Sequence, residues 1–136
     1  MPRCVIDTNV MLVCVSDRSP LHWIFRSFRA GAFEWCVTTE ILAEYAEIVE
    51  RHMGLVRSRD ALDALLSQAN LIKIGPTYRF NLLNDPDDNK FVDCAIAANA
   101  LCIVSHDRDF LPLREIEFPK VAVIDTVEFR ELLFAN

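Results

Sequence analysis

The chain has 136 residues, of which 52% are hydrophobic and 25% are charged. This is the size and composition of one globular domain that can bury a core without disulfide or zinc staples, and it excludes a disordered chain. The net charge of −6 argues against a protein that holds nucleic acid on a wide basic surface. It leaves open a site that collects divalent cations, because such a site must itself be acidic.

No apolar run approaches the ~18 residues that cross a bilayer, and Asp7 follows the start too closely for a signal peptide. We therefore expect a cytoplasmic protein. The cysteines lie in apolar segments, form no C-x-x-C pair and are odd in number, so they are interpreted as reduced, buried thiols rather than zinc or disulfide partners. They are Cys4, Cys14, Cys36, Cys94 and Cys102.

Short apolar segments alternate with helical patterns along the chain. In chain order, the sequence predicts a strand at 4–6, a helix at 21–28, a strand at 35–37, helices at 40–53 and 59–69, a strand at 71–74, a helix at 89–100, strands at 101–105 and 121–124, and a helix at 127–133. Short, non-alternating strands separated by helices are typical of a parallel sheet covered on both faces. We expect a single α/β domain over residues 1–136, a three-layer α/β/α sandwich with about five parallel strands.

Two acids follow predicted strands directly. Asp7 comes immediately after the first strand, and Asp107 follows the fourth strand by two residues. Ligands of open α/β sheets bind beyond the carboxyl ends of the strands, so the two acids share one pocket if these strands are neighbours. Asp7 alone is equally well explained as a helix or turn cap.

Two further acids lie on helices beside apolar residues. Glu44 falls at the edge of the apolar stripe of its helix, between Ile41 and Ile48, where it needs either a metal or a basic partner. Asp93 lies inside an alanine-rich helix among apolar neighbours, where a charge is costly unless it is paired or bound to metal.

The segments around these acids resemble four motifs of the PIN domain family, in the family's order. The motifs are Val5-Ile6-Asp7-Thr8-Asn9, Thr39-Glu40-Ile41-Leu42-Ala43-Glu44, Asp88-Asn89-Lys90-Phe91-Val92-Asp93-Cys94-Ala95-Ile96-Ala97 and Ile103-Val104-Ser105-His106-Asp107-Arg108-Asp109-Phe110. The resemblance covers residues 3 to about 123, and each motif alone is weak. The family often has Gly or Arg at the position of His106. The stretch 85–90 is most similar to VapC-like ribonucleases, the toxins of bacterial toxin–antitoxin pairs.

The resemblance implies a ribonuclease that uses one or two Mg²⁺ or Mn²⁺ ions. It implies Asp7, Glu44, Asp93 and Asp107 as the catalytic and metal-binding residues. It also implies an RNA substrate, a cognate antitoxin and a homodimer. Asp109 is the alternative fourth acid or an auxiliary metal ligand, although we expect it to cap the following turn.

Several neighbouring residues have open roles. Asp88 is either an auxiliary ligand or a helix cap, and Lys90 either contacts phosphate or is a solvated side chain. Thr8 and Asn9 either orient Asp7 or a water, or bond within a turn. His106 is a poor ligand for Mg²⁺, which prefers oxygen. Asp125 echoes Asp7 in sequence, and we expect it to cap the last helix.

Two other functions compete with a nuclease. A PIN fold that only binds RNA or protein would have lost one or more acids, and here all four positions are filled. A phosphatase with Asp7 as nucleophile usually needs a second Asp two residues later, where this chain has Asn9. Dinucleotide binding is excluded because no G-x-G-x-x-G follows the first strand.

Overall fold

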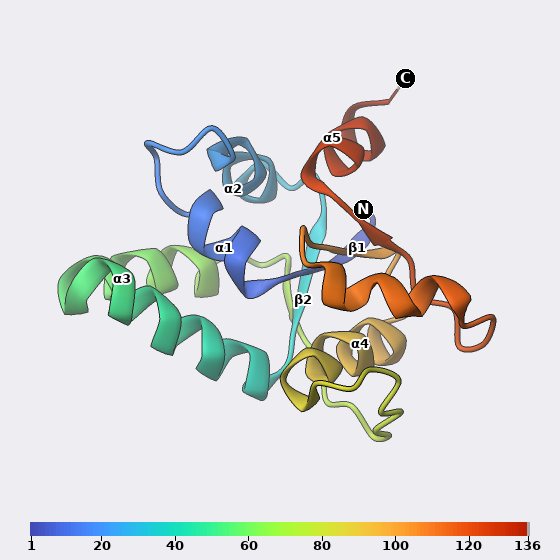
Figure 1. Cartoon of the computed structure of the whole chain (residues 1–136). Coiled ribbons are helices and arrows are strands. Elements are labelled where there is room, and N and C mark those ends of the chain that lie inside the picture. The colour runs from blue at the N-terminus through green and yellow to red at the C-terminus, as the bar shows by residue number, and fades with distance from the viewer. Residues whose placement is uncertain (136) are drawn as a thin grey trace.

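A five-stranded parallel sheet forms the centre of the computed structural model, which describes residues 1–135 (Figure 1). Its strands lie in the order β3-β2-β1-β4-β5, and every neighbouring pair is parallel. They are β1 (Arg3–Ile6), β2 (Glu34–Val37), β3 (Leu71–Lys73), β4 (Cys102–Val104) and β5 (Val123–Ile124). The predicted fold is confirmed. The first and fourth strands are neighbours, which is the condition for Asp7 and Asp107 to share one pocket.

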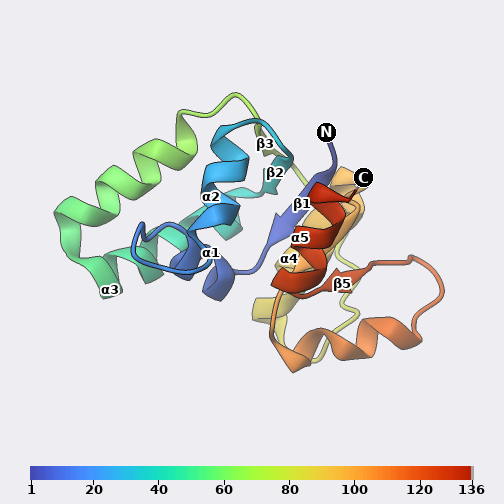
Figure 2. The same ribbon diagram turned by 90° about the horizontal axis from the view of Figure 1, so that it is seen from above.

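Helices cover both faces of this sheet. They are α1 (Thr8–Cys14), α2 (His22–Arg29), α3 (Thr39–Leu66), α4 (Pro86–Ala98) and α5 (Thr126–Phe134), with a 3-10 helix η1 (Arg108–Glu115). In Figure 1, α4 lies below the sheet, and α2 and α5 lie above it; the view from above in Figure 2 superimposes α5 on α4. Within residues 1–135, no helix is long and apolar enough to cross a membrane.

An aromatic core joins α3 to the end of β1. The ring of Trp35 packs against Phe28 and Tyr45, and its Nε1 donates a hydrogen bond to the Tyr45 hydroxyl at 3.3 Å. The Tyr45 hydroxyl in turn donates to the carbonyl of Ile6. The residue before Asp7 is therefore anchored to the helix that carries Glu44. All five cysteines are free and buried, as predicted.

Three helical segments differ from the prediction. The predicted helices 40–53 and 59–69 adjoin in α3 and are separated only by a kink at Gly54, where φ is 80° and ψ is 173°. The segments Thr8–Cys14 and Arg108–Glu115 were not expected to be helical. Both are short, and short helices depend on packing against the rest of the molecule more than on local sequence pattern.

Side chains cap the helices next to the sheet; one cap decides between the alternatives for Asp88, and another differs from the prediction. Asp85 accepts from the backbone N–H of Asp87, so Asp85, not Asp88, caps α4. Asp107 accepts from the N–H of Asp109 and caps η1, so the expected cap at Asp109 is wrong. Asp125 caps α5 in a capping box, as predicted, and follows the edge strand β5.

Candidate metal centre

Asp7 directly follows β1, and its backbone N–H donates to the carbonyl of Val104 at the end of the neighbouring strand β4. Its Oδ1 accepts a hydrogen bond from the backbone N–H of Asn9 at 2.9 Å, and its Oδ2 accepts one from the Ser105 hydroxyl. The oxygen of that hydroxyl also accepts from the N–H of Asp107, at 2.9 Å. Ser105 thus connects the acid after β1 with the acid after β4.

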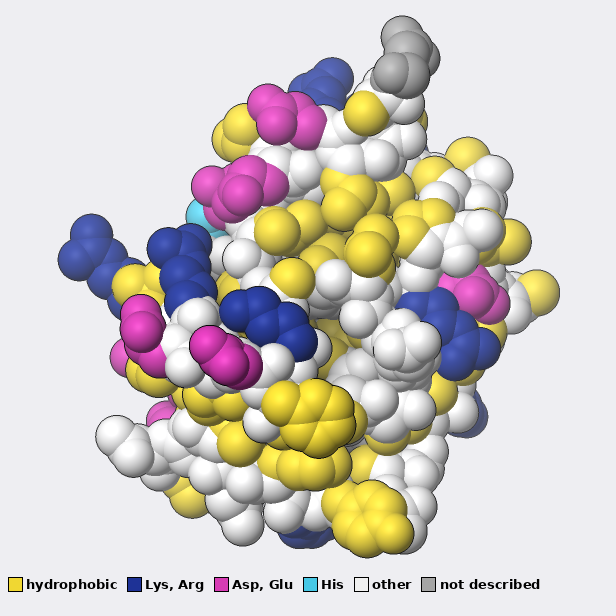
Figure 3. All heavy atoms as spheres, turned by 90° about the vertical axis from the view of Figure 1, so that its right-hand side faces the viewer, with side chains coloured by type: hydrophobic (Ala, Val, Ile, Leu, Met, Phe, Trp, Pro, Cys, Tyr) yellow, Lys and Arg dark blue, Asp and Glu magenta, His cyan; other side chains and the backbone are white. Residues whose placement is uncertain are grey.

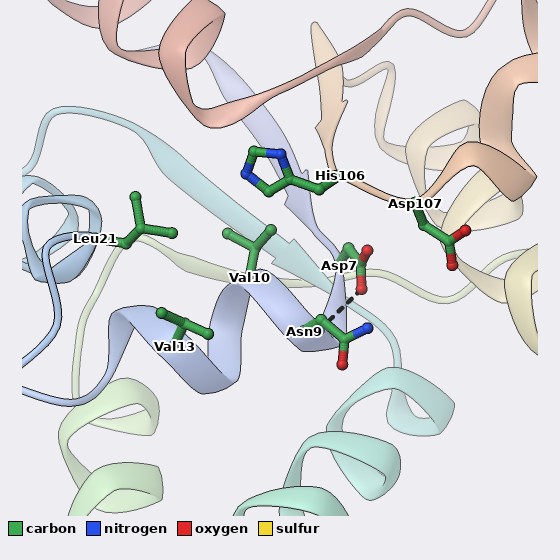
Figure 4. A pocket seen from close by; sticks show the side chains of 7 residues that line it. All are labelled: Asp7, Asn9, Val10, Val13, Leu21, His106 and Asp107. Atoms are coloured by element: carbon green, nitrogen blue, oxygen red, sulfur yellow. Dashed lines mark hydrogen bonds between the residues drawn. The ribbon is translucent and has the colours of Figure 1, made fainter.

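Three more carboxylates converge near Asp7. Asp88 is in the first turn of α4, and Asp107 and Asp109 open η1. One carboxylate oxygen from each of these three lies within 4.8 Å of the other two. Asp107 also lines one hollow together with Asp7 (Figure 4). We call Asp7, Asp88, Asp107 and Asp109 the acid group.

The acid group is electrostatically crowded. Burial raises the pKa of Asp7, and the charges of Asp107 and Glu44 raise it further, against the opposing hydrogen bonds from Ser105 and Asn9. Burial, followed by the charges of Asp85, Asp107 and other acids, raises the pKa of Asp88 to about 6. A divalent cation would relieve this repulsion, and carboxylate oxygens are the ligands that Mg²⁺ and Mn²⁺ favour. The residues present therefore fit such a metal.

Glu44 has two partners of its own. Its Oε2 accepts from the hydroxyl of Thr8, and its Oε1 lies 2.7 Å from the ammonium of Lys90. That ammonium also donates to the carbonyl of Asp87 at 2.7 Å, and the Lys90 side chain is only 11% exposed. Lys90 is therefore an internal counter-charge rather than a solvated side chain, and Thr8 bonds to Glu44 rather than within a turn.

The structure does not bring Asp93 into the acid group. Its Oδ1 accepts a hydrogen bond from the backbone N–H of Phe80 at 3.1 Å, so the carboxylate of Asp93 faces the loop before α4. Asn89, one helical turn earlier, bonds to the same loop. Its side chain accepts from the backbone N–H of Leu83 and donates to the carbonyl of Leu83. Residues 88 and 93 are about 140° apart around a helix with 3.6 residues per turn, so they point in different directions.

His106 turns away from the carboxylates. Its Nε2 lies 3.0 Å from the hydroxyl of Thr126, and Figure 4 shows its ring above Val10, on the opposite side of the backbone from the Asp107 carboxylate.

Ser105 was missed by sequence reasoning. The available signal was a polar residue at the end of an apolar strand, two positions before a candidate acid.

Comparisons with known proteins agree with this architecture. The family profile of the PIN domain matches residues 3–109. VapBC2 from Rickettsia felis, solved bound to a DNA fragment from its promoter, superimposes with a TM-score of 0.66 at 18% identity, covering 90% of this chain and 98% of that chain. The PIN domain endonuclease Utp24 superimposes with a TM-score of 0.53 at 17% identity, covering 90% and 84%.

No protein with curated annotation matches the sequence. The structural likenesses are below 25% identity and concern the fold, whereas the family profile spans most of the chain, including every candidate acid from Asp7 to Asp109. The chain belongs to the PIN domain family.

Proposed function

We propose that this protein is a cytoplasmic endoribonuclease that hydrolyses phosphodiester bonds with one or two Mg²⁺ or Mn²⁺ ions. The observation that carries the proposal is the acid group at the carboxyl ends of β1 and β4, where open α/β sheets bind their ligands. Membership of the PIN domain family supports a nuclease, and the oxygen-only donor set supports a hard divalent metal.

The acid group would hold the metal. Asp88, Asp107 and Asp109 each offer an oxygen within 4.8 Å of the other two, and Asp7, which lines the hollow together with Asp107, would be a further ligand. A bound divalent ion polarises the phosphoryl group and activates water for attack. Ser105 and Asn9 keep the Asp7 carboxylate oriented by donating to its two oxygens.

Glu44 and Asp93 have different proposed roles. Glu44 lies beside the acid group, with its charge balanced by Lys90, and would complete the site on the side of α3. Asp93, expected from the family resemblance as a ligand, would position the loop through Phe80 instead. The proposal therefore places Asp88 where the resemblance placed Asp93.

Cleavage of a mixed RNA pool tests this function. Purified protein is incubated with Mg²⁺, with Mn²⁺ and with EDTA, and Asp107→Asn protein is prepared identically. We expect metal-dependent cleavage that is lost in EDTA and in the variant. Equal RNA cleavage by wild type and Asp107→Asn would indicate a contaminating nuclease and contradict the proposal.

We further propose that the protein is the toxin of a toxin–antitoxin pair and forms a homodimer. Its support is the likeness to the VapBC2 structure and the hydrophobic surface of its C-terminal part. Figure 3 shows hydrophobic side chains gathered on this face, and Val127 and Phe134 of α5 are 65% and 55% exposed. Large exposed apolar patches mark protein interfaces.

Expression in a bacterial host tests the toxin proposal. Wild-type protein should arrest growth, and Asp107→Asn protein, which keeps the surface but lacks one ligand, should not. Light scattering of the purified protein should give twice the mass of one chain. Undisturbed growth despite soluble, RNA-cleaving protein would refute the toxin role and leave the nuclease standing.

A non-catalytic PIN fold that binds RNA or protein is the second candidate. The crowding of Asp7 and Asp88 speaks against it, because carboxyl groups with raised pKa values that lie together cluster at functional sites, and a bound metal would offset their repulsion. RNA binding that is equal with metal and with EDTA, together with no cleavage, would favour this candidate.

A further inference from the structure

A hollow of about 260 Å³ opens directly beside the acid group (Figure 4). Its lining combines two members of the acid group with a carboxamide, an imidazole and an apolar wall. The lining residues are Asp7, Asn9, Val10, Val13, Leu21, His106 and Asp107. Because Asp7 and Asp107 belong both to the hollow and to the acid group, the hollow is within reach of a molecule that would bind at the metal.

The wall away from the acids is apolar. Val10 and Val13 come from α1, and Leu21 comes from the segment before α2. Val10 is buried, whereas Val13 is 43% exposed. An apolar wall of this kind favours a weakly polar group over a sugar or a phosphate, whose hydrogen bonds with water it could not replace.

Two polar side chains also line the hollow. The hydrogen bond between His106 Nε2 and the Thr126 hydroxyl, at 3.0 Å, restrains the imidazole ring. The backbone N–H of Asn9 is bonded to Asp7, which holds the residue in place while its exposed carboxamide lines the hollow. His106 therefore offers the hollow an aromatic face, and the Asn9 carboxamide offers one acceptor and two donors.

A nucleobase matches this lining in each respect. Proteins read single-stranded RNA by stacking unpaired bases on aromatic rings, including histidine, and by hydrogen bonds to the base edges. The asparagine carboxamide pairs well with such an edge, adenine above all. We propose that this hollow binds the nucleobase next to the scissile phosphodiester, with His106 stacking on it and Asn9 reading its edge.

This inference rests on the proposed nuclease function, because the phosphate at the acid group delivers the base to the hollow. It gives His106 a task other than metal binding, in keeping with a ring that points at Thr126. Asn9 and His106 become specificity residues that would bias where RNA is cut.

Binding of small probes tests the inference without cleavage. Isotope-labelled protein with Mg²⁺ is titrated with ribose 5-phosphate and with the four ribonucleoside 5′-monophosphates, followed by two-dimensional NMR. We expect at least one nucleotide to bind about 5- to 100-fold more tightly than ribose 5-phosphate, the range that stacking of one base confers. The resonances of Asn9, Val13 and His106 should shift.

Variants of His106 test whether stacking on its ring, rather than the loss of any histidine, accounts for tighter binding of the nucleotide. His106→Ala should abolish the advantage of the nucleotide over ribose 5-phosphate, and His106→Phe, which restores an aromatic face, should recover it. His52→Ala is the matched control, because His52 is an exposed histidine that bonds only to the carbonyl of Ile48 on its own helix. Asn9→Ala should reduce discrimination among the four bases.

Two results would overturn the inference. One is equal affinity of the protein for ribose 5-phosphate and for every nucleotide; the other is a nucleotide advantage that survives in His106→Ala. Either would leave the hollow to another occupant, such as a side chain of a protein partner. Nucleotide binding at His106 without any cleavage of RNA would instead refute the nuclease and keep the base site.

Discussion

Ser105 and Asp7, 98 positions apart in the sequence, are joined by a hydrogen bond from the serine hydroxyl to the aspartate carboxylate. The bond exists because β1 and β4 are paired in parallel register, with Ile6 opposite Val104, so that both residues leave the sheet at the same edge. The same hydroxyl accepts from the N–H of Asp107. Ser105 therefore holds two proposed metal ligands in fixed relation.

Ser105→Ala should weaken metal binding. The hydrogen bond from Ser105 lowers the pKa of Asp7, so its loss raises that pKa further and disfavours the carboxylate form that binds metal. Loss of such outer contacts typically lowers metal affinity or activity about 10- to 100-fold. Titration calorimetry with Mn²⁺ measures the change. Ser67→Ala is the control, because the hydroxyl of the exposed Ser67 donates to the carbonyl of Ala64 at the end of α3. An equal loss in both variants would refute the role of Ser105.

Asp88 should make stability depend on pH and on metal. Its pKa is raised from 3.8 in the unfolded chain to about 6 in the folded protein. Between these values the folded state binds more protons, so the free energy of unfolding should fall as pH rises from about 4 to 6 and stay lower above pH 6. Mg²⁺ should therefore raise Tm more at pH 7.5 than at pH 5.

Neutralising Asp88 should remove both the loss of stability at high pH and the rise in Tm with Mg²⁺. Asp88→Asn should have a higher Tm than wild type without metal at pH 7.5, and should lose most of the rise in Tm with Mg²⁺. Asp87→Asn is the control, because Asp87 is an exposed neighbour outside the acid group. Thermal unfolding followed by circular dichroism gives both values. If Asp88→Asn keeps the full response to Mg²⁺, Asp88 is not a ligand.

Asp93→Leu should destabilise the fold. The substitution removes the acceptor of the Phe80 N–H, and leaving such a donor unsatisfied costs about 1–3 kcal/mol. Asp93→Asn keeps an acceptor oxygen and should cost less. Urea unfolding of the two variants measures the difference. Equal stability of both variants and the wild type would show that the contact with Phe80 is unimportant.

Gly54→Ala should also destabilise the protein. Gly54 has φ 80° and ψ 173°, a conformation that costs a residue with a side chain about 1–3 kcal/mol. Gly75→Ala is the matched control, because Gly75 has no positive φ and a Cβ added there would meet no atom within 4 Å. Equal effects of the two substitutions on urea unfolding would argue against a required kink in α3.

The sheet could be predicted from the sequence because its signals are local. Buried parallel strands such as Cys4–Ile6 and Trp35–Val37 are short apolar runs between helical patterns, and each run appears in the structure. The acid at the end of β1 and the acids after β4 follow from the same logic, since parallel strands present their carboxyl ends together.

The choice between Asp88 and Asp93 could not be made from sequence. Both lie in the same motif, and the position of Asp93 among apolar neighbours favours a metal ligand when only the sequence is considered. The structure gives Asp93 another explanation, the hydrogen bond with Phe80, which depends on the path of a loop with no periodic pattern. Ser105 and the caps at Asp85 and Asp107 also depend on such tertiary placement.

Comparison of Asp88→Asn with Asp93→Asn in single-turnover RNA cleavage tests the central claim most directly. A metal ligand contributes several kcal/mol to the transition state, so Asp88→Asn should slow Mn²⁺-dependent cleavage on the order of 100-fold or more. Asp93→Asn, if folded to the wild-type extent, should cut within a few-fold of the wild-type rate. The opposite ranking, with Asp93→Asn inactive and Asp88→Asn active, would contradict the proposed acid group and restore Asp93 as the ligand.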